Sequence, residues 1–276
     1  MPIRRGGVKI VLISPTTKIY ALVGKGISYS LSPYIHNFSF NKLNINAVYV
    51  VFDLNEDKFN KAIDGLLEVI EGVNVTIPYK ELIIRHLDEV DEVTRRIGAV
   101  NTIYNKRGYN TDYIAIKKLV QRKLKSLNGF RCYIMGAGGA GKAAAYALGE
   151  LGCKILINNR TKERALEVIK NLSSFGIEAE YVNDCNLNYD VLVNATPYPQ
   201  NIREECIRGL LVVDLVYRPI KTYLILNAMK KGIDIIDGLS ILINQAIEAQ
   251  KIWFGKSLDE EQIREYICQE ILSEEC

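Results

Sequence analysis

Met135-Gly136-Ala137-Gly138-Gly139-Ala140-Gly141-Lys142 is the stretch that decides the fold. It follows the short apolar run Cys132-Tyr133-Ile134 and leads into an alanine-rich segment that predicts a helix. A G-x-G-x-x-G pattern between a strand and a helix is typical of a dinucleotide-binding βαβ unit. Gly136 permits the tight turn, Gly138 lets the backbone approach a pyrophosphate, and Gly141 lets the helix pack on the strand. Because the N–H groups and dipole at a helix start favour phosphate, the stretch predicts a dinucleotide site.

The residues around this stretch alternate between strand-like and helix-like segments. We expect strands at 131–135, 154–158, 178–182, 190–195, 211–216 and 234–237, and helices at 139–151, 161–173 and 222–231. This order predicts βαβ units, a parallel sheet and right-handed crossovers. The second part of the chain is therefore predicted to be a Rossmann-like, doubly wound α/β domain.

The residues before Asn128-Gly129, a turn signal, predict a separate α/β domain. Apolar segments at 8–13 and 19–24 form either a hairpin or an added edge strand before the first core strand. We expect strands at 47–52 and 72–78, a hairpin around 105–108, and helices from Ser32 (as N-cap), at 55–71, 79–87 and 112–127. Two further amphipathic helices, at 240–254 and 259–273, end the chain.

Composition limits the possible classes of protein. A length of 276 residues suits two domains, and the net charge of +3 does not call for nucleic acid as a partner. No apolar stretch approaches the roughly 18 residues of a membrane span, and the apolar run at 8–13 is too short for a secretory signal. The six cysteines are widely spaced without a C-x-x-C pair, and only two histidines are present, so we expect no metal site. Reduced thiols in a cytoplasmic protein are the expected state.

The end of the second predicted nucleotide-binding strand, 154–158, indicates which dinucleotide binds. An acidic residue at that position favours NAD, whereas a basic residue accommodates the 2′-phosphate of NADP. Here Asn159-Arg160-Thr161 follows the strand without a carboxylate, and Arg164 comes one turn later. Thr161 either adds a hydroxyl to the site or caps the next helix. The alternative is an exposed turn with solvated arginines, but forked arginine–phosphate bonds make NADP the prediction.

Several polar residues in the first domain stand where a plain core would not place them. They are Ser30, Ser32, Asn74, Thr76, Lys80, Asn101 and Asp112. Asn74 and Thr76 are two residues apart on a strand and therefore share one face. Each residue alone has an ordinary explanation as a helix cap, a turn residue or surface charge.

Together, these segments resemble those of the shikimate dehydrogenases. The matching segments, in family order, are G-x-x-x-x-x-S-x-S-P-x-x-H-N at 24–37, N-V-T-x-P-x-K at 74–80, G-A-V-N-T at 98–102, N-T-D at 110–112, G-A-G-G-A at 136–140, N-R-T at 159–161, N-A-T-P at 194–197, D-x-x-Y at 214–217 and D-G-L-S-x-L-x-x-Q-A at 237–246. The resemblance implies reversible, NADP-linked reduction of 3-dehydroshikimate to shikimate in aromatic biosynthesis. It also implies a substrate-binding domain of residues 1–122 and 243–276, with a mainly parallel sheet, and an NADP-binding domain of residues 123–242.

The resemblance assigns roles to residues of this sequence. Implied substrate contacts are Ser30, Ser32, Asn74, Thr76, Lys80, Asn101, Asp112, Tyr217 and Gln245. Implied cofactor contacts are Gly136, Gly138, Gly139, Ala140, Asn159, Arg160, Thr161, Arg164, Asn194, Ala195, Thr196, Val216 and Gly238. Lys80 and Asp112 are the implied catalytic residues, because hydride transfer to a ketone needs a proton donor within reach. Whether Lys80 acts alone or with Asp112 stays open. Oxidation of the substrate needs a neutral lysine, so the rate of oxidation should rise with pH.

The sequence also departs from the family pattern. Tyr29 and Tyr113 stand where histidine and glycine are common, which affects the expected rim of the pocket. A quinate/shikimate dehydrogenase of broader substrate or cofactor range is therefore an alternative. A ligand sensor without catalysis is another, against which the retention of Lys80 and Asp112 argues. A homodimer is a further possibility.

Overall fold

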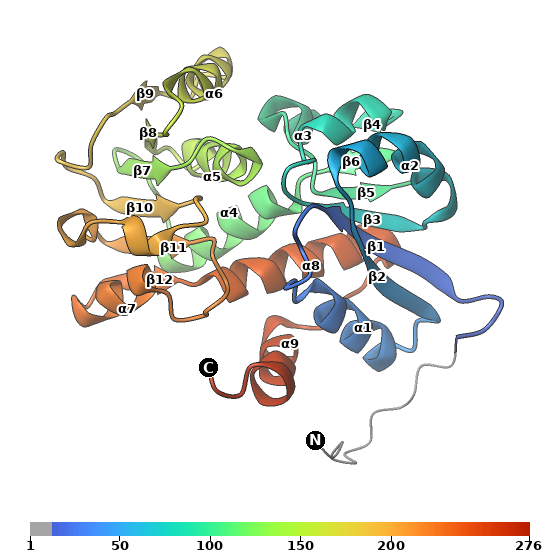
Figure 1. Cartoon of the computed structure of the whole chain (residues 1–276). Coiled ribbons are helices and arrows are strands. Elements are labelled where there is room, and N and C mark those ends of the chain that lie inside the picture. Colours follow the sequence, from blue (N-terminus) through green and yellow to red (C-terminus); the bar gives the residue numbers. More distant parts are fainter. Residues whose placement is uncertain (1–12) are drawn as a thin grey trace.

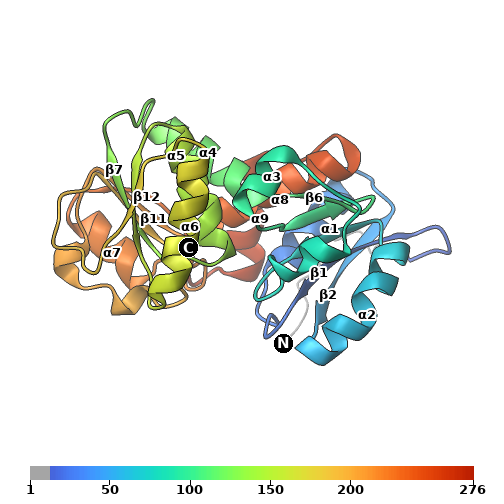
Figure 2. The same ribbon diagram turned by 90° about the horizontal axis from the view of Figure 1, so that it is seen from above.

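The computed structural model describes residues 13–276, which form two α/β halves side by side (Figures 1 and 2). The first half contains β1 (Lys18–Gly24), α1 (Ser32–Lys42), β2 (Ala47–Asp53), α2 (Glu56–Val69), β3 (Gly72–Val75), the 3-10 helix η1 (Leu82–His86), β4 (Glu89–Val90), α3 (Glu92–Ile97), β5 (Thr102–Tyr104) and β6 (Arg107–Tyr109). Its sheet has the order β2-β1-β3-β5-β6-β4. The pairs β1–β2, β1–β3 and β4–β6 are parallel, so this sheet is mainly parallel, as predicted.

The second half contains a fully parallel, doubly wound sheet. Its elements are β7 (Arg131–Met135), α5 (Gly139–Glu150), β8 (Lys154–Asn158), α6 (Lys162–Ser174), β9 (Ala179–Tyr181), β10 (Val191–Asn194), the 3-10 turns η2 (Pro199–Asn201) and η3 (Glu204–Cys206), β11 (Leu211–Asp214), α7 (Tyr223–Lys230) and β12 (Asp234–Ile236). The strand order β12-β11-β10-β7-β8-β9 reverses between β7 and β10, which is where such sheets bind their ligands. The predicted α/β class is confirmed.

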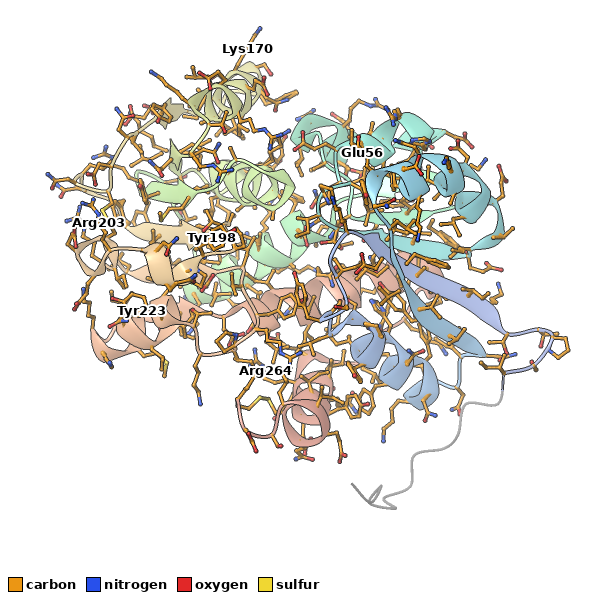
Figure 3. All side chains as sticks on the ribbon, viewed as in Figure 1. Glu56, Lys170, Tyr198, Arg203, Tyr223 and Arg264 are labelled. Atoms are coloured by element: carbon orange, nitrogen blue, oxygen red, sulfur yellow. A yellow bond between two sulfur atoms is a disulfide. The ribbon has the colours of Figure 1, made fainter. Side chains whose placement is uncertain are left out.

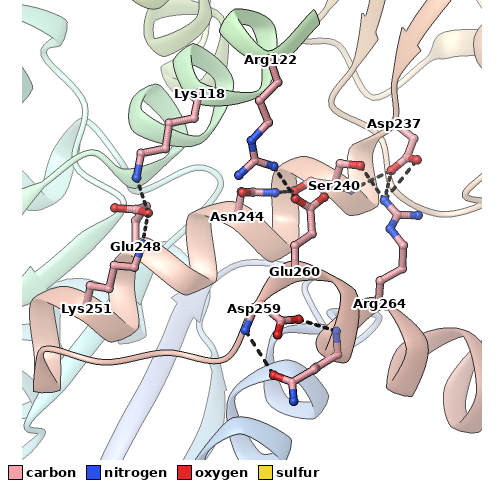
Figure 4. Close-up of polar contacts among 11 residues, drawn as sticks. Lys118, Arg122, Asp237, Ser240, Asn244, Glu248, Lys251, Asp259, Glu260 and Arg264 are labelled. Carbon is pink, nitrogen blue, oxygen red and sulfur yellow. Dashed lines mark hydrogen bonds and ion pairs between the residues drawn. The ribbon is translucent and has the colours of Figure 1, made fainter.

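Two long helices carry the chain between the halves. α4 (Thr111–Lys123) leads from β6 to the second half, and α8 (Gly238–Phe254) returns from β12 to the first (Figure 1). The two helices pack together, and Glu248 pairs with Lys118 at 2.6 Å across them (Figure 4). A boundary at 122/123 thus falls at the end of α4, and one at 242/243 falls inside α8.

The C-terminal segment packs against α8 and α1. It consists of α9 (Glu260–Tyr266) and a π-helical turn, Ile267–Ile271. Arg122 of α4 pairs with Glu260 at 2.8 Å, and Arg264 pairs with Asp237, the residue that caps α8 (Figure 4). The end of the chain is therefore fixed to both connecting helices.

Two local predictions were wrong. Residues 79–87 form a turn and the 3-10 helix η1 instead of an α-helix. Ser32 lies inside α1, whose N-cap is Leu31, because the Ser30 hydroxyl instead accepts the Ser32 N–H. The segment expected at 8–13 lies, except for its last residue, outside the described residues. Within residues 13–276, no helix combines the length and the hydropathy needed to cross a membrane.

The expectation of reduced thiols was also wrong. The structure contains the disulfides Cys132–Cys153, Cys185–Cys206 and Cys268–Cys276, which leave no free cysteine. Cys132 lies in β7 and Cys153 directly precedes its neighbour β8, so sheet pairing brings their Cα atoms to 6.1 Å. Sequence spacing alone does not reveal such pairs, because their proximity depends on the sheet.

Candidate active site

The glycine-rich loop joins β7 to α5 and is packed too closely for side chains. Gly136 has φ +107°, and a Cβ there would lie 2.9 Å from the Ala195 carbonyl oxygen. A Cβ at Gly141 would lie 2.1 Å from the Gly136 carbonyl oxygen. By contrast, Gly138 faces open space at the N-cap of α5. The loop therefore presents backbone N–H groups at the start of α5 to an open surface, the arrangement that binds phosphate.

The residues after β8 surround the outer end of this loop. Asn159 accepts a hydrogen bond from Ala137 N–H at 3.1 Å and donates to the Thr161 carbonyl, which fixes the turn to the glycine loop. Thr161 is the N-cap of α6 by position, but its side chain makes no capping bond, which leaves the hydroxyl available. Arg160 and Arg164 are exposed and have no ion-pair partner among residues 13–276.

The loop after β10 contains Asn194, Ala195 and Thr196. Asn194 is fully buried, and its Oδ1 accepts from both the N–H and the hydroxyl of Thr196. Its Nδ2 donates to the Thr196 carbonyl and to Asp214. Because both amide hydrogens and both lone pairs are used, the Asn194 side chain shapes the loop and has no unpaired polar atom for a cofactor. Tyr198, just beyond this loop, is 55% exposed (Figure 3).

Asp214 is a buried residue whose role the sequence did not indicate. Besides Asn194, it accepts hydrogen bonds from the Val216 N–H and from the Thr222 hydroxyl. Burial raises its pKa, and these hydrogen bonds partly oppose the shift. Gly238 lies against the resulting turn, since a Cβ there would stand 2.3 Å from the Val216 carbonyl oxygen. Asp214 thus fixes the backbone that carries Val216 and Tyr217.

Lys80 and Asp112 form an ion pair at the junction of the two halves. The Lys80 Nζ lies 2.5 Å from Asp112 Oδ2, and the two side chains are only 14% and 12% exposed. Lys80 lies in the turn before η1, and Asp112 lies in the first turn of α4, where the helix dipole favours a carboxylate. A Cβ at Gly139 would lie 3.2 Å from Lys80 Cβ, so the lysine packs directly on the glycine loop of the other half.

A buried polar network continues from this ion pair into the first half. Asn101 Oδ1 accepts the Thr111 N–H at 2.7 Å, while Asn101 Nδ2 has no hydrogen-bond partner among residues 13–276. The Thr111 hydroxyl lies 3.0 Å from that of Thr102 and 3.4 Å from Gln245 Oε1. Asn74 Nδ2 donates to Thr102 Oγ1 at 3.0 Å. These contacts bring together Asn74, Asn101 and Gln245, which are far apart in sequence.

Ser30 lies in the loop between β1 and α1, and Ser32 lies at the start of α1. Asp53 accepts the N–H groups of Gly26 and Ile27 at 2.7 and 2.9 Å and thereby anchors this loop. Tyr217 from the second half lies close enough to the Ser30 side chain for the two to interact. Burial and the nearby Tyr29 raise the pKa of Tyr217 to about 12, an effect that the Ser30 side chain opposes. The Tyr217 hydroxyl is therefore neutral and can donate or accept a hydrogen bond.

The remaining expected site residues differ in their surroundings. Thr76, just after β3, is half-buried, and a Cβ at Gly24 would lie 2.5 Å from its methyl group. The Tyr29 ring lies 6.2 Å from the Tyr217 ring, between centroids, so that Tyr29 of the first half meets Tyr217 of the second. The Tyr113 hydroxyl donates to Glu150 of α5, so this side chain bridges α4 and α5.

Family models match both halves of the chain, and a protein of similar length matches nearly all of it. Residues 22–103 match the model for the shikimate dehydrogenase substrate binding domain, and residues 118–211 match the model for shikimate/quinate 5-dehydrogenase. The chain is 56% identical over 258 residues to a shikimate dehydrogenase (NADP(+)) of Saccharolobus islandicus, covering 92% of this chain and 96% of that protein.

Solved structures also share the whole fold. Shikimate 5-dehydrogenase of Thermus thermophilus, solved with NADP(H) and shikimate, has a TM-score of 0.79 and 32% identity, covering 90% of this chain and 98% of that one. Quinate dehydrogenase of Corynebacterium glutamicum, solved with NAD, has a TM-score of 0.80 and 28% identity, covering 90% and 98%. On this sequence identity and coverage, the chain belongs to the shikimate dehydrogenase family.

Proposed function

We propose that the protein catalyses the reversible, NADP-dependent reduction of 3-dehydroshikimate to shikimate, a step of aromatic (chorismate) biosynthesis. The observation that carries this proposal is the Lys80–Asp112 ion pair, which lies against Gly139 of the glycine loop. A proton-transferring group and a dinucleotide-binding loop are thus adjacent. The names of the relatives agree with this activity.

The residues of the second half fit NADP. Gly138 and the N-terminus of α5 would hold the pyrophosphate, together with Gly136, Gly139 and Ala140. Arg160 and Arg164, both exposed and unpaired in the described structure, would hold the 2′-phosphate with the Thr161 hydroxyl. Ala195, Thr196, Val216 and Gly238 would border the rest of the cofactor. When bound, NADP supplies the hydride that the reaction transfers.

Lys80 moves the proton. In the reduction direction its ammonium group donates to the developing alkoxide oxygen, and in the oxidation direction the neutral amine accepts the hydroxyl proton. Asp112 orients the lysine, since its Oδ2 holds Nζ at 2.5 Å. Because the two side chains are mostly shielded from water, their interaction is stronger than that of an exposed pair.

The remaining polar groups recognise the substrate. The hydroxyls of Ser30, Ser32 and Tyr217 bind its carboxylate side without adding fixed charge. Asn74, Thr76, Asn101 and Gln245 bind its hydroxyls, and the free Nδ2 of Asn101 is a donor for this purpose. Such a site discriminates strongly, because a ligand without the matching hydroxyls leaves buried polar groups unpaired.

We infer the domain division that the resemblance implied. Within the described residues, 13–122 and 243–276 would bind the substrate, and 123–242 would bind NADP. The enzyme works in the cytoplasm on small molecules, as a monomer or a homodimer, and sedimentation velocity distinguishes the two states.

One set of assays tests the function. Purified protein is given shikimate or quinate, each with NADP or NAD, and reduced nicotinamide is followed by absorbance. We expect the largest kcat/KM with shikimate and NADP. Comparable oxidation of quinate would indicate the broader quinate/shikimate activity, and no oxidation of either compound would refute the proposal in favour of a ligand sensor.

A further inference from the structure

Tyr49 of β2 is a buried tyrosine whose hydroxyl reaches the proposed substrate residues. The residue is 2% exposed, and its hydroxyl donates to Asn74 Oδ1 at 2.8 Å. Burial raises the pKa of Tyr49 well above its usual value, an effect that the nearby Ser32 side chain opposes. This buried hydroxyl therefore holds a residue that is 25 positions away in sequence and that faces the substrate in the proposed site.

The hydrogen bonds around Asn74 fix which way its amide points. Nδ2 donates to the Asn101 carbonyl at 3.2 Å and to Thr102 Oγ1 at 3.0 Å. A backbone carbonyl oxygen only accepts hydrogen bonds, so Nδ2 must face it, and Oδ1 must face Tyr49. Both amide hydrogens are then used. What remains for a ligand is one lone pair on Oδ1, which can accept from a hydroxyl but cannot donate to a carboxylate.

Tyr49 is itself held in place. The side chain of Asn37 accepts the Tyr49 N–H at 2.8 Å and donates to the Tyr49 carbonyl at 3.0 Å. The Tyr49 ring stacks on His36, with centroids 4.3 Å apart and an interplanar angle of 14°. Burial lowers the pKa of His36 to about 3, so this imidazole is neutral at ordinary pH and the stack carries no charge. These contacts aim the hydroxyl at Asn74 before any ligand arrives.

We propose that Tyr49 is a positioning residue for the substrate pocket, whose hydroxyl holds the Asn74 amide with Oδ1 as an acceptor for a substrate hydroxyl. The inference rests on the proposed function and adds a residue that touches neither substrate nor cofactor. Without the Tyr49 hydroxyl, Oδ1 loses its fixed partner, and only the two Nδ2 hydrogen bonds restrain the amide. Preorganisation of this kind contributes to affinity because the ligand need not order the site.

The test is Tyr49→Phe, which keeps the ring and its stack on His36. We expect the KM for shikimate to rise about tenfold, the scale of one lost hydrogen bond, while kcat stays within about twofold. The Kd for NADP should not change. The matched control is Tyr189→Phe in the second half, because the Tyr189 hydroxyl is also buried and donates to the Cys206 carbonyl. The control should leave the KM for shikimate at the wild-type value.

An unchanged KM in Tyr49→Phe, or an equal change in both variants, would overturn the inference. Coupling gives a second measurement. In an Asn74→Ala background, adding Tyr49→Phe should raise KM by much less than tenfold, because the residue through which Tyr49 acts is gone. A full tenfold further rise would refute the role. A wild-type protein that does not oxidise shikimate would instead refute the proposed function.

Discussion

The side chain of Lys80 packs on Gly139, so that a Cβ at Gly139 would lie 3.2 Å from both Lys80 Cβ and Lys80 Cδ. The lysine belongs to the first half and the glycine to the loop of the second. The same lysine reaches Asp112 at 2.5 Å. The group that carries the proton is thus positioned by residues of both halves. A side chain at 139 would push the lysine away from this position, which accounts for a glycine at a site without positive φ.

Replacing Lys80 by methionine tests its role with the least disturbance of packing. Lys80→Met keeps an unbranched side chain against Gly139 but removes the ammonium group. We expect kcat to fall by about 10²-fold or more, the scale of lost acid–base catalysis, with the Kd for NADP unchanged. Lys142→Met is the control, since Lys142 pairs with Glu81 at 2.8 Å at the same junction. A Lys80→Met enzyme that retains most of its turnover would show that the proton moves elsewhere.

The exposed arginine after β8 should decide between the two dinucleotides. Arg160→Ala should raise the KM for NADP by at least about tenfold, the effect of losing a charge-assisted hydrogen bond, and should change the KM for NAD little. Initial rates with shikimate and either dinucleotide measure both values. Lys162→Ala is the control, because Lys162 lies over the Tyr181 ring at 5.3 Å and is not assigned to the phosphate. Equal losses for NADP and NAD in Arg160→Ala would contradict the 2′-phosphate role.

Because burial lowers the pKa of His36, we expect the folded protein to lose stability in mild acid. The pKa of His36 is about 3 in the folded protein and 6.5 in the unfolded chain, so only the unfolded chain takes up a proton between these values. Stability from this residue is complete above pH 6.5 and is lost as pH falls towards 3. At about pH 5 the expected loss is about 2 kcal/mol, since each pH unit below the unfolded pKa contributes roughly 1.4 kcal/mol.

Denaturant unfolding at about pH 7.5 and about pH 5 measures this loss. The free energy of unfolding of the wild type should fall by about 2 kcal/mol more than that of His36→Asn, which has no imidazole to protonate. The comparison removes the contribution of carboxylates, which titrate in both proteins. An identical fall in the two proteins would show that His36 is not responsible.

The disulfides predict a second stability effect. Cys132 and Cys153 close a loop with a sequence separation of 21. By chain entropy, replacing both by alanine should lower the free energy of unfolding by about 3 kcal/mol. Thiol titration of the unfolded, unreduced wild type should detect no thiols, because no free cysteine is present in the structure. Detection of thiols under those conditions would disprove the pairing.

Local pattern predicted much of the fold but not the internal organisation of the site. The glycine loop and the βαβ alternation depend on neighbouring residues, so β7, α5 and β8 were predicted to within about a residue. The contact between Tyr49 and Asn74 depends on the pairing of β1 with both β2 and β3, which no short motif encodes. Asn194 matched a motif, but the hydrogen bonds that occupy its whole side-chain amide became visible only in the folded chain.

Each of the three disulfides lies within one part of the chain, and none joins the two halves. Cys132–Cys153 and Cys185–Cys206 lie within the second half, and Cys268–Cys276 lies within the C-terminal segment. None joins the first sheet to the second, and between the halves the chain runs along α4 and α8. The disulfides therefore restrain unfolding within the second half and within the C-terminal segment. They do not restrain the angle between the two sheets. Oxidation can raise heat resistance without slowing any opening and closing that turnover requires.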